Sequence, residues 1–414
     1  MRSLQIQNGN RTSKAATGVA VLFHRLGPYH FARLRETAQQ LSVTAVEFSR
    51  VDNTYAWEEI AGAEGFQRIT LFDDADSHSY PAAEVAARTQ AALETARPSA
   101  VAIPGWSDPA ALAALRWCLA KQVPAVMMSE TTAWDEQRQP WREWIKQRVV
   151  QLCASALVGG RPHKEYLVQL GMPARHVFFN YDAVDNAHFR QAAERASQQT
   201  DTLRNRLTLP ERYFLASARF IEKKNLPRLL TAYARYRQMT DRAGAWNLVL
   251  LGDGEMRPQL EALATELGIQ GAVQMPGFKQ YQELPVYYGL ASAFVHASTV
   301  EQWGLVVNEA MASGLPVLVS NCCGCAADLV REGHNGFTFD PYDAEQLAQL
   351  FLRISQMSAA ERQTMGQHSQ QLIAAWGPEA FAAGMQQAVE AALSHPRPRA
   401  GWLDRLLLEM LIRR

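Results

Sequence analysis

Apolar runs and helical periodicity alternate along the first half of the chain. The apolar runs are short and continuous, as in strands buried on both faces of a parallel sheet. The predicted strands are Val19–Phe23, Val43–Phe48, Arg68–Phe72, Ala100–Ile103, Ala125–Met128, Leu157–Val158 and Val177–Phe179. Helical periodicity fills most of the gaps, as at Pro109–Ala120 and Trp141–Cys153. This pattern predicts an α/β domain with a parallel sheet.

A second alternating series follows a polar segment, Asp185–Leu209, that is rich in Gln, Arg and Ala. The segment contains no predicted strand, and we interpret it as a connection between domains. The second series comprises strand Tyr213–Ala218, helix Leu226–Tyr236, strand Asn247–Leu251, helix Met256–Leu267, strand Ala272–Met275, helix Tyr281–Leu290, strand Ala293–His296, strand Leu315–Val319 and helix Ala344–Gln356. Two such series predict two doubly wound domains, residues 1–190 and 205–375, that face each other across a cleft. Residues 376–414 follow them.

Composition narrows the class of protein. A chain of 414 residues is too long for one ordinary core, and 48% hydrophobic residues indicate globular packing. Lys+Arg and Asp+Glu both number 41, so no net charge favours nucleic acid. The first 14 residues are polar and lack the apolar core of a secretory leader. No apolar run reaches the ~20 residues that span a bilayer. These features predict a cytoplasmic protein.

The cysteines and one acidic pair do not indicate a metal site. Cys322, Cys323 and Cys325 lack the spacing of a zinc site, and we interpret them as small packing residues. Asp74 and Asp76 form an Asp-x-Asp sequence, but they lie far along the chain from the motifs described next. We therefore expect no metal and no cofactor.

Two glutamates carry the strongest chemical signal. Glu301 and Glu309 are separated by seven residues and lie before and within a predicted helix that precedes a buried strand. Both carboxylates are thus expected near the carboxyl end of a strand, where open α/β sheets bind ligands. The backbone N–H groups of Gly304, Leu305 and Val306 suit an anion. Carboxylates for hydroxyl groups beside N–H groups for a phosphate are typical of a nucleotide-sugar site.

This segment resembles the E-x7-E motif of the retaining GT-B glycosyltransferases of family 4. The resemblance continues through Leu315-Pro316-Val317 to Asn335-Gly336-Phe337. It covers most of residues 205–390 well and residues 1–185 only in layout. It implies the GT-B fold, with two facing Rossmann-like domains. It also implies a C-terminal helix that crosses back to the first domain, and Trp376-Gly377-Pro378 followed by Ala380–Leu393 resembles that crossing.

The resemblance implies a catalytic role for Arg219, Lys224 and Glu301. Arg219 and Lys224 follow a predicted strand and match the family's basic pair that binds the donor phosphates. Glu301 is expected near the donor sugar, where it helps to stabilise charge as the glycosidic bond opens. Asn225 stands where the family commonly has glycine. Considered without the two glutamates, Arg219 and Lys224 would fit a solvated basic turn equally well.

Further residues are expected to bind the donor. Glu309 matches the family glutamate that accepts hydrogen bonds from the ribose. Gly252 lies in a Gly-Asp-Gly turn after a strand, and Phe278 lies in the loop that receives the base in the family. Gly27 lies in the first-strand loop, which has one glycine where the family has a glycine-rich sequence. For each, an ordinary turn or packing role is the alternative.

Acceptor residues and a membrane surface are weaker inferences. Glu130 follows a predicted strand and could orient an acceptor hydroxyl, and His30 could touch substrate. Tryptophans mixed with bases at 134–148, and an amphipathic tail at 402–414, suit peripheral contact with the inner membrane face. Packed surface helices explain both segments as well.

The sequence therefore predicts a retaining hexosyltransferase that moves a sugar from a nucleotide-diphosphate donor to a saccharide or lipid-linked saccharide. The expected setting is surface polysaccharide or glycolipid biosynthesis, by analogy with the family. A nucleotide-sugar 2-epimerase, a synthase that uses a soluble phosphorylated acceptor, and a non-catalytic sugar-nucleotide-binding protein are the alternatives.

Overall fold

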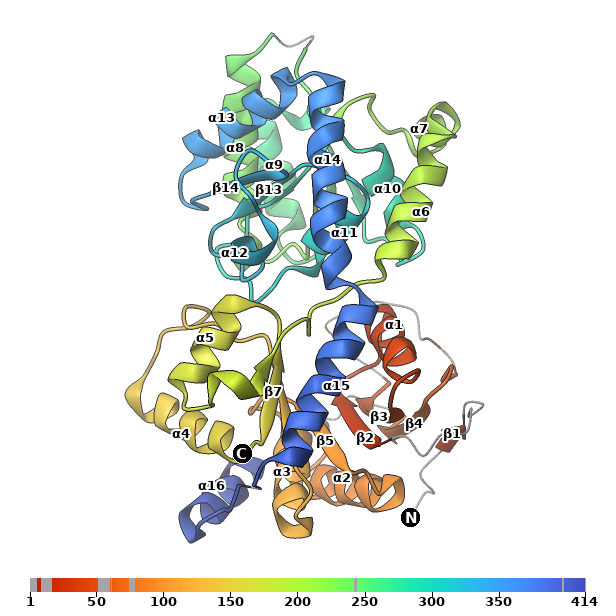
Figure 1. The fold of residues 1–414 in the computed structure, drawn as a ribbon. Coiled ribbons are helices and arrows are strands. Elements are labelled where there is room, and N and C mark those ends of the chain that lie inside the picture. The colour runs from red at the N-terminus through yellow and green to blue at the C-terminus, as the bar shows by residue number, and fades with distance from the viewer. Residues whose placement is uncertain are drawn as a thin grey trace. The chain divides into compact units, whose positions relative to one another are not determined.

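The computed structural model describes residues 6–8, 17–50, 60, 62–73, 79–241, 244–396 and 398–413. The chain divides into two compact units (Figure 1). Unit 1 comprises Met1–Ala183 and Gly377–Arg414, and unit 2 comprises Val184–Trp376. The predicted domain bounds at 190, 205 and 375 stay predictions, and the units of the structure divide the chain at 183/184 and 376/377.

Unit 1 is built on an eight-stranded sheet in the order β1-β4-β3-β2-β5-β6-β7-β8. All neighbours are parallel except β1, which pairs antiparallel with β4. The strands are β1 (Ile6–Asn8), β2 (Gly18–Phe23), β3 (Ser42–Ser49), β4 (Gln67–Phe72), β5 (Ala100–Pro104), β6 (Ala125–Ser129), β7 (Ser155–Val158) and β8 (Val177–Phe178). The helices are α1 (Pro28–Thr37), α2 (Ala82–Ala96), α3 (Pro109–Lys121), α4 (Pro140–Gln151), α5 (Arg161–Gln169), α15 (Pro378–Ser394) and α16 (Trp402–Ile412).

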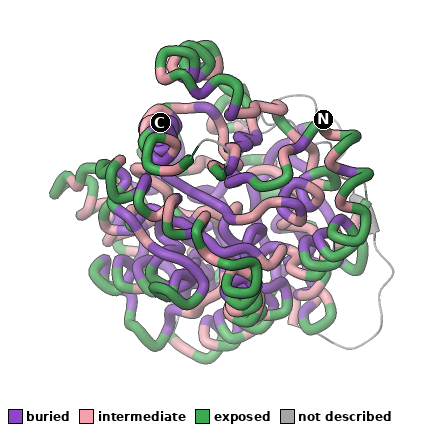
Figure 2. The backbone as a smooth tube through the Cα atoms, turned by 90° about the horizontal axis from the view of Figure 1, so that it is seen from above, coloured by how far each residue is buried: buried purple, intermediate pink, exposed green. Residues whose placement is uncertain are grey.

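Helices cover both faces of this sheet, because successive residues of each strand point to opposite sides. Val19 and Val21 of β2 pack in one cluster with residues of α1 and α15. Ala20 and Leu22 pack in the other cluster, with residues of α2 and α3. Figure 2 shows the buried residues along the interior, with exposed residues on the outer turns. Burial on both faces explains why the strands read as continuous apolar runs.

Unit 2 is built on a six-stranded parallel sheet in the order β11-β10-β9-β12-β13-β14. The strands are β9 (Tyr213–Ser217), β10 (Asn247–Leu251), β11 (Val273–Gly277), β12 (Ala293–His296), β13 (Val317–Ser320) and β14 (Gly336–Phe339). The helices are α6 (Asn186–Ser197), α7 (Thr200–Leu207), α8 (Leu226–Met239), α9 (Arg257–Glu266), α10 (Leu284–Leu290), α11 (Leu305–Ala312), α12 (Ala326–Leu329), α13 (Ala344–Gln356) and α14 (Ala359–Ile373).

The C-terminal helix α15 completes unit 1, as the predicted crossing requires. Phe381, Met385 and Val389 are buried in the same cluster as residues of β2 and α1. The Ser155 hydroxyl of β7 donates a hydrogen bond of 2.7 Å to the carbonyl of Ala388. A side chain at Gly384 would lie 2.4 Å from the Phe179 carbonyl, so only glycine permits this close approach of helix and strand.

One interpretation of the sequence was wrong. The segment 185–209 is not merely a connection, because α6 and α7 form within it and α6 packs against α10 and α11 of unit 2. A β-carbon added at Gly289 of α10 would lie 2.7 Å from the Cα atom of Ala193 of α6, so the two helices are in close contact. The polar composition reflects the outward faces of two surface helices.

Candidate functional site

The strand order of unit 2 fixes where a ligand can bind. The first strand of the unit, β9, lies between β10 and β12, so the chain reverses its direction of winding between β9 and β12. Open α/β sheets bind ligands at the carboxyl ends of the strands at such a switch point. Arg219 and Lys224 follow β9, and Glu301 follows β12. The topology therefore brings the predicted basic pair and the first glutamate to one edge of the sheet.

Glu301 is the centre of a polar network. Its Oε2 atom accepts a hydrogen bond from the Lys224 ammonium group, which forms an ion pair with it. The same oxygen lies 3.1 Å from Nε2 of His296 and accepts a hydrogen bond of 3.2 Å from the Ser298 hydroxyl. Side-chain exposure is only 13% for Lys224 and 14% for Glu301, so solvent screens the pair weakly.

The ionisation of this network follows from its geometry. Burial alone would raise the pKa of Glu301, but the hydrogen bond from His296 and the charge of Lys224 together hold that pKa well below its usual value. Burial lowers the pKa of His296 despite its contact with Glu301. At neutral pH, Glu301 is thus a carboxylate and His296 is neutral, with its Nε2–H donating to Glu301. The sequence reasoning missed His296 and Ser298, although their place at the end of a strand was a usable signal.

The backbone conformation and the side-chain contacts of Asn225 explain why asparagine is accepted where the family commonly has glycine. Its φ is +57°, in the left-handed region that glycine and asparagine tolerate best. Its side-chain amide also donates hydrogen bonds to the carbonyls of Ala297, at 3.1 Å, and Pro341, at 2.8 Å. The residue therefore ties the Lys224 turn to the loop that leads to Glu301.

The helix α11 presents its N-terminus at this edge. Gly304, with φ +106°, is the residue before the helix, and the first N–H groups of a helix have no partner within it. Leu305 and Val306 form the first turn, so the three N–H groups predicted to suit an anion lie together. The partial positive charge of the helix end adds to the field of Lys224.

Glu309 lies in the second turn of α11 and is completely buried. Its Oε2 atom accepts a hydrogen bond of 2.6 Å from the hydroxyl of Tyr288, which is also buried. Burial, then the neighbouring Glu309 charge, raises the pKa of Tyr288 well above its usual value, so the phenol stays a donor. A ribose would reach Glu309 only if the surrounding side chains open.

The cysteine loop pairs with the glutamate loop through the backbone. The N–H of Gly324 donates to the Glu301 carbonyl at 3.0 Å, and that of Cys325 to the Trp303 carbonyl at 3.2 Å. Cys323 and Cys325 are buried, which fits their interpretation as packing residues. The described residues hold no group of three metal-ligating side chains. Asp74 and Asp76 lie outside the described residues.

Glycines shape the neighbouring turn. A side chain at Gly252, with φ +122°, would lie 1.9 Å from the Ala218 carbonyl, and one at Gly254 would lie 2.6 Å from the Phe220 carbonyl. Glycine is thus required for the turn to approach the loop that carries Arg219. Arg219 is half-buried there, and Phe278 is 37% exposed after β11.

The unit 1 candidates lie after two different strands, Gly27 and His30 after β2 and Glu130 after β6. Gly27 precedes α1, and its N–H donates to Nδ1 of His30 at 3.1 Å, so His30 caps its own helix. Burial, with the charge of Arg33, lowers the pKa of His30 to about 3. Glu130 follows β6 and is half-buried beside Asp182, whose pKa rises because of burial and the Glu130 charge. His30 therefore has a structural role that the sequence left open.

Part of the chain is similar to known glycosyltransferases. Residues 199–372 match the family model described as "Glycosyl transferases group 1". The chain is 34% identical over 140 residues to the lipopolysaccharide core biosynthesis glycosyltransferase LpsE of Rhizobium meliloti, covering 34% of this chain and 38% of that protein. It is 26% identical over 227 residues to the α-D-kanosaminyltransferase of Streptomyces kanamyceticus, covering 54% and 57% respectively. The matched region thus spans between about two fifths and three fifths of these relatives.

A solved structure extends the comparison to nearly the whole chain. Anabaena HepE, crystallised in complex with UDP, superposes with a TM-score of 0.67 over 90% of this chain and 100% of its own, at 17% identity. Such similarity shows the fold. The chain therefore has the GT-B fold, and over residues 199–372 it is similar to the group 1 glycosyl transferases.

Proposed function

We propose that the protein is a retaining glycosyltransferase that moves a hexose from a nucleotide-diphosphate donor to a saccharide or lipid-linked saccharide acceptor, without a metal or other cofactor. The names of its relatives support a role in surface polysaccharide or glycolipid biosynthesis, since LpsE is a lipopolysaccharide core biosynthesis glycosyltransferase. The name of the HepE structure supports a nucleotide donor, because that protein is in complex with UDP.

The observation that carries the proposal is the Lys224–Glu301 ion pair at the switch point of unit 2. It puts a cation for a diphosphate beside a carboxylate for sugar hydroxyls, next to the N-terminus of α11. A nucleotide diphosphate is already a good leaving group, so the reaction needs charge stabilisation more than a strong acid. Arg219, Lys224 and the helix N–H groups would supply it.

Each residue has a distinct task in this scheme. Arg219 and Lys224 hold the diphosphate and stabilise its charge as the glycosidic bond opens. Glu301, fixed as a carboxylate by His296, orients the donor sugar and stabilises positive charge at the anomeric carbon. Glu309 accepts hydrogen bonds from the ribose once the side chains that bury it move aside. Glu130 of unit 1 is the candidate for orienting an acceptor hydroxyl.

Calorimetry with UDP, GDP and ADP in metal-free buffer tests the donor site. We expect one nucleotide to bind the wild type, and Arg219→Ala to weaken that binding about tenfold or more, since a charge-assisted contact is lost. Arg235→Ala is the matched control, because Arg235 is an exposed arginine of α8 in the same unit. Binding of none of the three nucleotides would contradict the proposal.

Product analysis tests the reaction. With the nucleotide known, the sugar donor and candidate acceptors are incubated with the protein, and the new glycosidic bond is analysed by NMR spectroscopy. Retention requires the donor's anomeric configuration in the product, and an inverted product would refute the retaining mechanism. Donor conversion without acceptor would identify the epimerase alternative instead, and tight binding without turnover would identify a binding protein.

A further inference from the structure

The first turns of helix α4 have the reverse of the usual surface-helix arrangement, whereas its last turn buries Val149 and Val150 in the core. Its charged residues Glu143 and Lys146 point inward, with side-chain exposures of 21% and 9%. Its tryptophans point outward, since Trp141 is 53% exposed and Trp144 is 45% exposed. A helix on an aqueous surface normally buries its large apolar side chains and exposes its charges. The inverted pattern needs an explanation.

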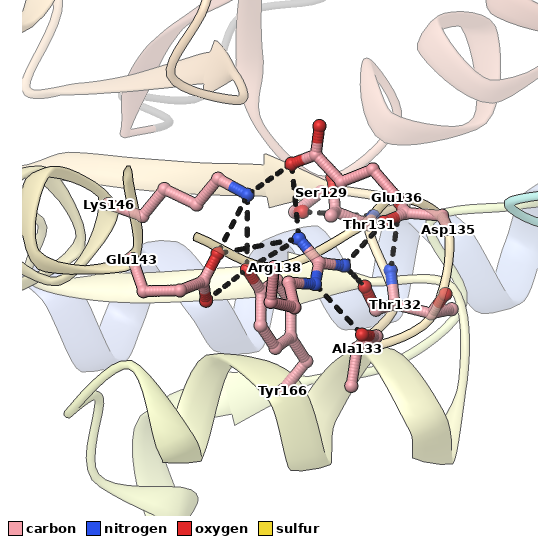
Figure 3. Close-up of polar contacts among 10 residues, drawn as sticks. All are labelled: Ser129, Thr131, Thr132, Ala133, Asp135, Glu136, Arg138, Glu143, Lys146 and Tyr166. Atoms are coloured by element: carbon pink, nitrogen blue, oxygen red, sulfur yellow. Dashed lines mark hydrogen bonds and ion pairs between the residues drawn. The ribbon is translucent and has the colours of Figure 1, made fainter. Parts of the chain in front are cut away.

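A network of polar contacts joins the inward charges of α4 to the loop before it and to α5 (Figure 3). Lys146 donates to Glu143 at 3.1 Å and to Glu136 at 2.5 Å. Tyr166 of α5 donates to Glu143 at 2.8 Å and accepts from Arg138 at 2.9 Å. Arg138 also pairs with Asp135 in the loop before α4 (Figure 3). Rotating the tryptophans inward would break this network and leave partly buried charges unpaired.

The C-terminal helix α16 packs chiefly against α3, reaches α4 through an ion pair, and shares the character of α4. Arg148 of α4 donates to the Asp404 carboxylate at 2.5 and 2.8 Å, and this contact joins the two helices. Leu407, Leu408 and Ile412 bury the inner side of α16. The outer side carries large apolar residues one turn apart: Trp402 is 78% exposed, Leu406 is 50% exposed and Met410 is 54% exposed. The exposed tryptophans among the described residues are Trp134, Trp141, Trp144 and Trp402.

The charges left at the surface of these two helices are positive. The acidic residues of α4 and α16 are Glu143, Asp404 and Glu409, and each forms an ion pair, with Lys146, Arg148 and Arg116 respectively. Arg142 of α4 and Arg405 of α16 are exposed, and Arg413 just after α16 is exposed at 4.0 Å from Glu409, which already pairs with Arg116. The surface of α4 and α16 thus combines exposed tryptophans with exposed arginines, while each of its carboxylates is already in an ion pair.

We propose that the surface formed by α4 and α16 docks the protein on an anionic lipid bilayer. Tryptophan is the side chain best suited to the interface between headgroups and acyl chains, and arginine pairs with anionic headgroups. None of the helices in the described part of the chain is long and apolar enough to cross a membrane. In the proposed docking, the exposed apolar side chains of α4 and α16 are inserted among the headgroups, and both helices lie in the plane of the interface.

A second copy of the chain fits this surface less well. A symmetric dimer places the same patch of each subunit against the other. Arg142 and Arg405 of both copies would then be gathered in one interface whose acidic groups are already paired. Like charges at an interface are unfavourable. An anionic bilayer supplies the missing negative charge over a wide area.

Vesicle flotation with the full chain tests the proposal. Vesicles of phosphatidylcholine alone are compared with vesicles of equal parts phosphatidylcholine and phosphatidylglycerol. We expect binding to the mixed vesicles that weakens as salt is added, because headgroup attraction is screened. The double variants Trp141→Glu/Trp144→Glu and Trp402→Glu/Leu406→Glu should each reduce the bound fraction roughly tenfold. Met239→Glu is the control, since Met239 is 41% exposed at the end of α8 in unit 2.

Every outcome decides the proposal. Wild-type protein that floats with neither vesicle, or double variants that float like the wild type, would overturn it. If sedimentation shows a dimer that the double variants abolish, without vesicle binding, a second copy covers the surface instead. Thermal melting of each variant establishes that it is folded. Should a tryptophan variant unfold, Arg142→Glu/Arg405→Glu replaces it, with binding lost only for phosphatidylglycerol vesicles. Flotation is measured without substrates, so its result is independent of the proposed enzymatic activity.

Discussion

Single residues of the candidate site hold one another in fixed ionisation states. His296 and Lys224 keep Glu301 charged. The hydroxyl of Tyr288 stays protonated and donates a hydrogen bond to Glu309. Under the proposed function, the carboxylate contacts a sugar in one orientation and benefits from partners that fix both its charge and its rotamer. Substitutions of these partners should therefore change the site without touching a ligand.

The hydrogen bond from Tyr288 to Glu309 should contribute more than an ordinary one. Tyr288→Phe removes a 2.6 Å hydrogen bond to a buried carboxylate, and we expect a loss of about 2–3 kcal/mol in the free energy of unfolding. Tyr213→Phe is the comparison, since it removes a 2.6 Å bond to the neutral carbonyl of Tyr287 and should cost about 1 kcal/mol. Urea denaturation at neutral pH measures both. Equal losses would mean that the charge of Glu309 adds nothing.

His30 should make the protein sensitive to mild acid. The folded state lowers the pKa of His30 from 6.5 to about 3, so protonation favours the unfolded chain and stability falls as pH drops below 6.5. Because the ring is only half-buried, we expect about 1 kcal/mol of this loss by pH 5. His30→Gln keeps a side-chain acceptor for Gly27 but cannot titrate. Its free energy of unfolding should match the wild type at pH 7.5 and exceed it at pH 5; parallel pH profiles would contradict the role of His30.

At the scale of elements, the close contact between α6 and α10 reverses a usual expectation. Glycine within a helix normally costs about 0.5–1 kcal/mol relative to alanine. At Gly289, however, the added methyl group would lie 2.7 Å from the Cα atom of Ala193 and would push the helices apart. Packing should therefore outweigh helix propensity.

We expect Gly289→Ala to destabilise the protein by about 1–3 kcal/mol, the usual cost of overpacking. Thermal or urea unfolding measures the change. Gly271→Ala serves as the control, because an added methyl group there has no atom within 4 Å among the described residues. A Gly289→Ala protein that is more stable than the wild type would show that α6 can move freely.

Elements were predictable from the sequence where the signal was local. Buried strands such as β9 and β12 were confirmed almost to the residue, because both faces are apolar. Helix α10 starts at Leu284 rather than Tyr281, where Pro285 favours the first turn. The strands β1 and β14 and the helix α14 were not predicted. The short strand β1 depends on pairing with β4, which no local pattern reveals.

The place of the candidate residues in the fold was predictable, but their contacts were not. The spacing of Glu301 and Glu309 and the basic pair pointed to the switch point, where the structure places them. The ion pair between Lys224 and Glu301 joins residues far apart in the sequence, so only the sheet order brings them together. The burial of Glu309 and the capping role of His30 likewise depend on tertiary packing.

At the scale of the whole molecule, the two units differ in whether they are formed by one continuous segment of the chain. Unit 2 is one continuous segment, Val184–Trp376, with its own core, whereas unit 1 needs residues from both ends of the chain. Without α15, the cluster that contains Phe381, Met385 and Val389 loses its cover. We therefore expect unit 2 to fold independently and the residues of unit 1 before it to need α15.

Fragment expression tests this difference. We expect residues 184–376 to fold alone, with a cooperative melt and the same nucleotide preference as the full chain. Residues 1–183 should lack a cooperative transition by circular dichroism, because one face of the sheet would expose its apolar residues. Adding residues 377–414 as a separate chain should restore that transition. A cooperative melt of residues 1–183 alone would disprove the dependence on α15.

The placement of α15 also affects the order of events on the ribosome. In most proteins of several domains, the N-terminal domain is complete first and folds while the rest is being translated. Here the strands of unit 1 emerge before unit 2, but the helix that covers one face of their sheet is translated only after unit 2. We therefore expect the middle of the chain to fold first during synthesis. The sheet of unit 1 would then expose one apolar face, and be bound by chaperones, until α15 emerges.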